Sequence, residues 1–228
     1  MACSQCATEK EHAVAASNLE RMRYFPRQLL TADDMRTEQE YFREKQRRHN
    51  RFLHGWGVVC GLQVVADPQA GVSAVQVCPG YALGPFGDEI YVAEPVRFDL
   101  AQCMAASANR CVPGAVTDPP AVGETRDLIV GIRYAECPSR PMRTLPAGCG
   151  CDESACEYSR TRDGFEIRCV SAPVVTKQAE PASGQPVPCP ACSDDPWIRL
   201  ATVRTGGAAL VITYANRRVL PSPAMMPA

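Results

Sequence analysis

Histidine and long apolar runs are both scarce in this chain. Only 3 of its 228 residues are histidine, so a hydrolytic triad or a histidine metal centre is difficult to build. No run of about 18 apolar residues occurs, which excludes a membrane-spanning helix. A basic surplus is missing as well, because 24 Lys and Arg residues face 25 Asp and Glu residues. Nucleic acid is therefore not an expected partner.

The sequence also lacks the short motifs that mark common catalytic sites. It contains no nucleophile elbow, phosphate-binding P-loop, zinc-protease helix motif or dinucleotide-binding glycine loop. Its adjacent acids, Asp88 with Glu89 and Asp194 with Asp195, stand beside turns, where carboxylates are usually solvated or bonded to backbone. We therefore predict that the protein is not an enzyme.

Cysteine, by contrast, is abundant, with 13 residues. The N-terminus has neither the basic head nor the apolar segment of a secretory signal, so we expect a reducing compartment in which thiols stay reduced or bind metal. Cys60, Cys78 and Cys169 stand within apolar or strand-like runs. We predict that these three are small buried hydrophobes.

Most other cysteines cluster at spacings typical of metal ligands. A tetrahedral zinc site needs four soft ligands, and a Cys-x-x-Cys pair joined by two thiolates of a nearby loop would supply them. The candidate ligands are Cys149, Cys151, Cys156, Cys189 and Cys192. A zinc site is therefore one hypothesis. The alternatives are unligated loop thiols, or disulfides formed after release from the cell.

The pattern predicts one long helix over residues 31–54. Thr31 is suited to cap its N-terminus, with Asp34 as the partner in a capping box. Acidic residues precede basic ones along the helix, in the order that its dipole favours, and Gly55 ends it.

A thin apolar stripe runs along this helix. Its members are Met35, Phe42, His49 and Leu53, and glutamines fill the intervening steps. The first three repeat every seven residues, so the stripe fits either a seam that docks the helix on its own domain or a seam between copies in a homo-oligomer. Docking on the same domain is the preferred interpretation.

From residue 56 onwards the hydrophobic period changes to two, which indicates half-buried strands. Strands are expected over 56–64, 73–78, 81–84, 89–92, 127–134 and 165–170, with a hairpin formed by 197–203 and 208–214. The predicted fold class is α+β, mainly antiparallel β. We expect one long N-terminal helix packed on a β-sandwich or barrel-like body.

The same pattern divides the chain into segments. They are a flexible N-terminal arm (1–22), a helical assembly segment (23–55), a β-rich body (56–220) and a tail (221–228). Within the body, residues 136–160 are expected to form a cysteine-rich loop and residues 171–196 a proline-rich loop.

Two features around the helix suggest close contacts. An aromatic and arginine-rich ledge precedes it at Arg23, Tyr24 and Phe25, side chains that are favoured at interface centres. Packing of Tyr24 and Phe25 on the protein's own core is the alternative. The glycines around Trp56, at positions 55, 57 and 61, allow a tight helix-to-strand corner or the close approach of a partner's backbone.

The segments 23–34, 38–42 and 50–62 together resemble an N-terminal module of small proteins encoded with phage-tail-like contractile injection systems. The most specific block is RYFPRQLLTADD at 23–34, in which Arg27 holds a turn position where glycine is often expected. The glycine-turned hairpin after residue 76 is similar to that of baseplate and tail-fibre proteins. The segments that carry the resemblance are 23–34, 38–42, 50–62, 77–83, 87–90, 156–165 and 195–201.

The resemblance implies a non-enzymatic structural or adaptor subunit, baseplate-associated, that acts by protein–protein assembly. It implies other particle subunits and further copies of the chain as partners, no required cofactor, and cytoplasmic synthesis before incorporation into a released particle. The interface candidates are Arg23, Tyr24, Phe25, Met35, Phe42, His49, Leu53 and Trp56. The alternative function is a zinc- or iron–sulfur-binding module.

Overall fold

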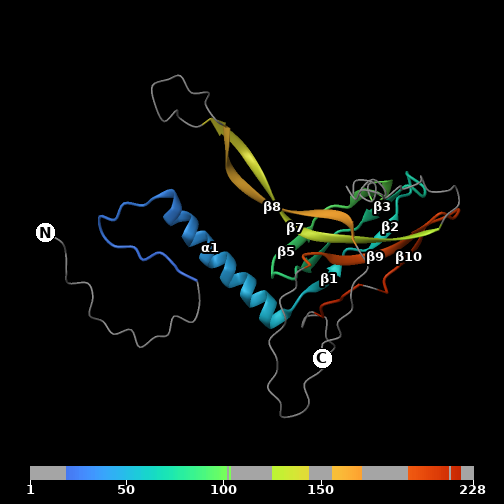
Figure 1. The fold of residues 1–228 in the computed structure, drawn as a ribbon, viewed down its shortest axis with the longest axis horizontal. Coiled ribbons are helices and arrows are strands. Elements are labelled where there is room, and N and C mark those ends of the chain that lie inside the picture. Colours follow the sequence, from blue (N-terminus) through green and yellow to red (C-terminus); the bar gives the residue numbers. More distant parts are fainter. Residues whose placement is uncertain are drawn as a thin grey trace, which may run out of the picture. The chain divides into compact units, whose positions relative to one another are not determined.

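The computed structural model describes residues 19–101, 103, 125–143, 156–170, 195–215 and 217–221. Figure 1 shows their helices and strands along the chain. The elements are α1 (Ala32–His49), the π-helical turn η1 (Asn50–His54), β1 (Gly57–Gly61), β2 (Val64–Ala66), β3 (Ala74–Val77), β4 (Gly80–Leu83), β5 (Glu89–Val92), β6 (Val96–Asp99), β7 (Arg126–Arg143), β8 (Cys156–Val170), β9 (Ile198–Thr205) and β10 (Val211–Thr213).

The predicted capping box begins α1. The backbone N–H and the hydroxyl of Thr31 each donate to Asp34 Oδ2 at 2.8 Å, and the Asp34 N–H donates back to Thr31 Oγ1 at 3.2 Å. The bonds from Thr31 favour the ionised carboxylate and lower the pKa of Asp34. At the other end, Gly55 has a φ of 79° and ends the helical segment as predicted.

Docking of the helix on the β body is not observed. No residue of α1 is buried. The apolar stripe is interrupted by Gln39 and Gln46, and its two large apolar side chains on α1, Met35 and Phe42, are exposed. The chain divides into two compact units, Met1–Arg47 and Arg48–Ala228.

Within the described residues, the strands form three antiparallel sheets. Their strand orders are β1-β4-β5, β2-β3-β6 and β10-β9-β7-β8. The predicted antiparallel β class with one α-helix is therefore confirmed for this part of the chain. The strand orders are open, so the expected barrel-like closure is wrong here.

One apolar core joins the three sheets. Each contributes fully buried aliphatic side chains to the same cluster. The largest fully buried residues are Leu62, Ile90, Ile132, Ile198, Leu200, Val58, Val64, Val75, Val77, Val92, Val130 and Val203.

The single strand expected over 56–64 is divided into β1 and β2. The register of β1 against β4 shifts between Val58 and Cys60, and Leu62 adopts a φ of 52°. This bulge reverses the alternation, so Cys60 is exposed instead of buried. Cys78 is half-buried. The prediction that both thiols are buried hydrophobes is wrong.

β7 and β8 are much longer than the sequence pattern indicates. They pair from Ile129 with Val170 to Arg143 with Cys156, and Arg140 is the only residue of β7 in this span without a register partner on β8. The prediction of a loop over 136–160 is therefore wrong for residues 136–143 and 156–160, which belong to β7 and β8. Pro138 and Pro141 lie within β7, and proline is tolerated on a strand that lacks a neighbour on its other side. β9 pairs with β7 only as far as Ile132. We call residues 136–143 and 156–163 the ribbon (Figure 1).

A disulfide joins two of the sheets. Cys169 lies on β8 and is bonded to Cys103, which follows β6, with 5.2 Å between the two Cα atoms. The prediction of Cys169 as a free buried hydrophobe is therefore wrong. Its partner lies 66 residues away in the sequence, and spacing alone does not indicate the pair.

Backbone atoms of the same chain lie very close to Gly57 and Gly61, two of the glycines around Trp56. A Cβ at Gly57 would lie 2.8 Å from the carbonyl oxygen of Arg218, and one at Gly61 would overlap the carbonyl of Pro79. The N–H of Val58 donates to that Arg218 oxygen at 2.9 Å. The close approach that these glycines permit is thus filled by segments of the same unit.

Replacing Gly61 with alanine should lower the free energy of unfolding by about 2 kcal/mol or more, because a left-handed backbone is strained with a Cβ and because Pro79 blocks the space. The matched control is Gly71→Ala, which has the same φ of +61° and no atom within 4 Å. It should cost about 1 kcal/mol. Denaturant unfolding measures both losses, and equal losses would contradict a steric role for Pro79.

Replacing Cys169 with serine should lower the free energy of unfolding of the oxidised protein by about 4 kcal/mol, because the disulfide closes a loop of 66 residues. Reductant should cause a similar loss in the wild-type protein and little further loss in the variant. Thermal unfolding with and without reductant measures the effect. A wild-type protein insensitive to reductant would contradict the disulfide.

Candidate functional site

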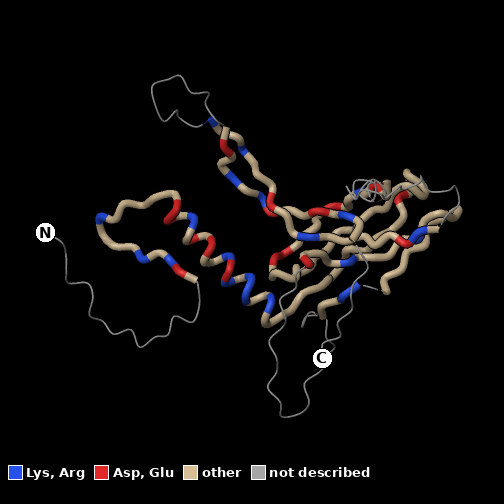
Figure 2. The backbone as a smooth tube through the Cα atoms, viewed as in Figure 1, with Lys and Arg blue, Asp and Glu red and all other residues tan. Residues whose placement is uncertain are grey.

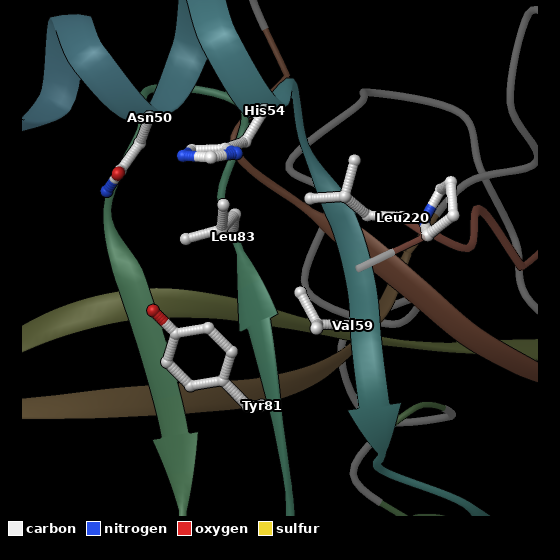
Figure 3. Close-up of a pocket in the computed structure, with 7 residues that line it drawn as sticks. Asn50, His54, Val59, Tyr81, Leu83 and Leu220 are labelled. Carbon is white, nitrogen blue, oxygen red and sulfur yellow. The ribbon is translucent and has the colours of Figure 1, made fainter. Parts of the chain in front are cut away.

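A pocket of about 220 Å³ lies in the second unit, beside the end of the helical segment (Figure 3). Strands β1 and β4 and the C-terminal described segment form its walls. Its lining residues are Asn50, His54, Val59, Tyr81, Leu83, Leu220 and Pro221. The volume is below the roughly 300 Å³ at which small-molecule sites begin.

Asn50 anchors one wall of this pocket. Its side chain is buried, and its Nδ2 donates to the carbonyl of Gly87 in the turn between β4 and β5 at 2.9 Å. Its own carbonyl accepts from the N–H of Gly55 at 3.0 Å. Asn50 therefore ties the end of the helical segment to the β4–β5 hairpin, which is a structural role.

Tyr81 supplies the phenol of the pocket. Burial raises the pKa of Tyr81 to about 12, and the neighbouring Glu89 on β5 adds to the shift. The phenol is therefore protonated at neutral pH and acts as a neutral hydrogen-bond donor. None of the lining residues forms a nucleophile–base pair.

The interface candidates of the first unit are all exposed. Met35 and Phe42, two helical turns apart on α1, are 48% and 60% exposed. Arg23, Tyr24 and Phe25 are exposed before the helix. Leu29, which the sequence reasoning did not select, is 85% exposed. The sequence did contain an indication of this residue, since two adjacent leucines precede the N-cap residue Thr31.

The turn that contains Arg27 has the geometry that its position indicated. Arg27 has a φ of 66°, the left-handed region that glycine adopts at little cost. The N–H of Gln28 donates to the carbonyl of Phe25 at 3.2 Å, and the side chain of Gln28 accepts from the Phe25 N–H at the same distance. Phe25 is therefore exposed, and its backbone is fixed by hydrogen bonds with Gln28.

The remaining candidates belong to the second unit. His49 is exposed and Leu53 is 70% exposed. Trp56 is half-buried, and the Arg218 guanidinium lies over its ring at 4.2 Å. Trp56 is therefore occupied by a cation–π contact within its own chain.

Of the candidate metal ligands, only Cys156 is described. Its thiol is exposed at the start of β8, opposite Arg143. Cys149, Cys151, Cys189 and Cys192 lie outside the described residues. Among the side chains that the structure does describe, no group of three or more potential ligands is found, so nothing there supports the zinc hypothesis.

The ribbon is an exposed surface that sequence reasoning missed. From residue 158 to residue 162, tyrosine and arginine side chains alternate with the small hydroxyl side chains of Ser159 and Thr161. This alternation has the period of two that is typical of a strand. The absence of apolar residues at alternate positions hid the strand. Separately, no helix in the described part of the chain is long and apolar enough to cross a membrane.

The phenol of Tyr81 should ionise near pH 12, whereas tyrosine in an unfolded chain ionises at about pH 10. Its contribution to the free energy of unfolding should therefore decrease as the pH rises from about 10 to about 12. NMR titration of the ring signal, assigned by its loss in Tyr81→Phe, measures this. Ionisation at the unfolded-chain value would show that the ring is not desolvated. Tyr91→Phe serves as the control and should leave the signal unchanged.

Neither a protein-family model nor a curated protein matches this chain. Among solved structures, the crystal structure of TssK matches with a TM-score of 0.39 and 14% sequence identity over 87% of this chain. The chain spans 42% of the length of that structure's chain.

Proposed function

We propose that this chain is a non-enzymatic structural or adaptor subunit of a contractile, phage-tail-like injection particle, and that it acts by binding other subunits. One observation carries the proposal: α1 buries none of its own residues while it exposes Met35 and Phe42. A helix of this kind gains its tertiary stabilisation from a partner.

The energetics of α1 support a partner. Isolated helices of about 15 residues are marginal in water, and most helical stability in proteins comes from packing of an apolar face. Burial of a phenylalanine or methionine side chain contributes about 1.5–3 kcal/mol. Covering Met35 and Phe42 would therefore supply the apolar burial that α1 does not show in the described part of the chain.

The exposed ledge before the helix extends the same surface. Tyr24, Phe25 and Leu29 stand within a short stretch of chain and are all exposed. Aromatic side chains lose little conformational entropy on contact and are enriched at interface centres. These residues belong to the 23–34 block, the most specific part of the resemblance to proteins of contractile injection systems.

The β body suits the role of a rigid support. Its three sheets share one core, and a disulfide links two of them. In this proposal the chain is made in the cytoplasm, requires no cofactor, and enters a released particle together with other subunits and further copies of itself. The exposed residues of α1 and of the ledge are the contact sites.

Replacing Met35 and Phe42 together with serine should abolish co-purification of the tagged full-length chain with the proteins encoded beside it, because their burial drives the contact. The matched control is Glu40→Ser, an exposed change on another side of the same helix. It should leave co-purification intact. Mass spectrometry of the purified material identifies the partners.

A wild-type chain that stays free of sheath, tube and baseplate proteins would overturn the proposal. Equal co-purification by the double variant and the control would show that α1 is not the contact. Circular dichroism of both variants verifies that each retains its helix and sheets.

A further inference from the structure

The ribbon is exposed to solvent along its whole length. In residues 136–143 and 156–163 only Ser139 is half-buried, and the rest are exposed. A hairpin of two strands is marginally stable in water without a third strand or a packed face. Within the described residues, no third strand pairs with it. The ribbon is therefore a structure whose stabilising contact is not supplied by its own sheet.

The register of β7 with β8 separates the ribbon's charges by sign. Residues opposite each other share a face, and the faces alternate along each strand. One face carries Glu136 opposite Asp163, and Met142 opposite Glu157. We call it the acidic face. Tyr134 begins it, and its hydroxyl donates to Asp163 Oδ1 at 2.6 Å.

The opposite face is basic. Cys137 is paired with Arg162, Ser139 with Arg160, and Arg143 with Cys156. Tyr158, opposite Pro141, lies among these arginines and is 60% exposed. Figure 2 shows charges of both signs along the two strands.

Arg140 belongs to neither face. Its φ of 56° departs from the extended conformation, so its side chain does not follow the alternation. A two-stranded ribbon has a right-handed twist, which rotates its two faces by the same angle along the strands. The acidic and basic faces therefore stay opposite each other along the ribbon.

Two prolines influence how a partner meets the ribbon. Pro138 and Pro141 each lack a backbone N–H, and proline is a residue that discourages pairing at a strand edge. Pairing along the β7 edge is thereby weakened. The side-chain faces, with charges and one large apolar residue each, are the better contact surface.

We propose that the ribbon is a self-association element, in which the acidic face of one copy binds the basic face of the next. Both complementary faces lie on the same chain, and a partner of a single charge would leave one of them unmatched. Met142 on the acidic face and Tyr158 on the basic face, both exposed, supply a sulfur–aromatic contact. Such a contact is heterologous and joins copies head to tail into a ring or a filament.

This inference stands independently of the contact proposed for α1, because it concerns a different surface. Two variants of the full-length protein test it. The basic-face variant is Arg160→Glu with Arg162→Glu, and the acidic-face variant is Glu136→Lys with Glu157→Lys. Both change exposed residues and leave the bond between Tyr134 and Asp163 in place.

Each variant alone has two faces of like charge, so its self-association should weaken by about 100-fold or more. An equimolar mixture of the two should associate again, because each variant now complements the other. Sedimentation velocity measures the masses against the 24.7 kDa of one chain. Wild-type association should also weaken when salt is raised from about 0.1 M to 1 M, because the Debye length shrinks from roughly 10 Å to 3 Å.

The controls are Arg21→Glu and Glu94→Lys, which each reverse one charge in the same sense at an exposed position outside the ribbon. They should associate as the wild type does. A wild-type chain that is monomeric at every concentration overturns the proposal. So does association that both ribbon variants retain. Loss of self-association in Met35→Ser with Phe42→Ser, but not in the ribbon variants, would assign the contact to α1 and overturn the ribbon as its site.

Discussion

The burial of apolar side chains from three small sheets in one shared core is the constraint that organises the β body. Strands of three to five residues form the β1-β4-β5 and β2-β3-β6 sheets, and the buried side chains of both sheets belong to one cluster. The longer β7 and β9 supply the remaining aliphatic residues, such as Ile132 and Leu200. The disulfide between Cys103 and Cys169 then joins two sheets that hydrophobic contact already holds together.

A single strand illustrates how this core supports the surface. The first half of β7 contributes Val130 and Ile132 to the core, and its second half continues into solvent as one side of the ribbon. The buried half fixes the direction and register of the exposed half. The acidic and basic faces of the ribbon depend on the strand register, and that register is fixed by the buried half of β7. The protein's exposed features, on the ribbon and on α1, have chemistry suited to contact with other proteins.

Local patterns predicted the elements whose stabilising contacts are close in sequence. The capping box of Thr31 and Asp34, the stop at Gly55 and the strand Glu89–Val92 match the structure, because each depends on contacts within a few residues. The exposed residues of the ledge and helix could also be selected, since aromatic and apolar side chains in a polar stretch are visible in the sequence. Their exposure, and the engagement of Trp56 by Arg218, required the structure.

By itself, the sequence determined a capped helix, a mainly antiparallel β body and the absence of familiar catalytic motifs. Tertiary structure decided the bulge that exposes Cys60, the bond between Cys103 and Cys169, and the extension of β7 and β8 through a segment rich in proline and cysteine. The physical reason is common to all three. Each depends on a partner strand or residue distant in the chain, and pairing across such distances overrides the local preference for a loop or a buried thiol.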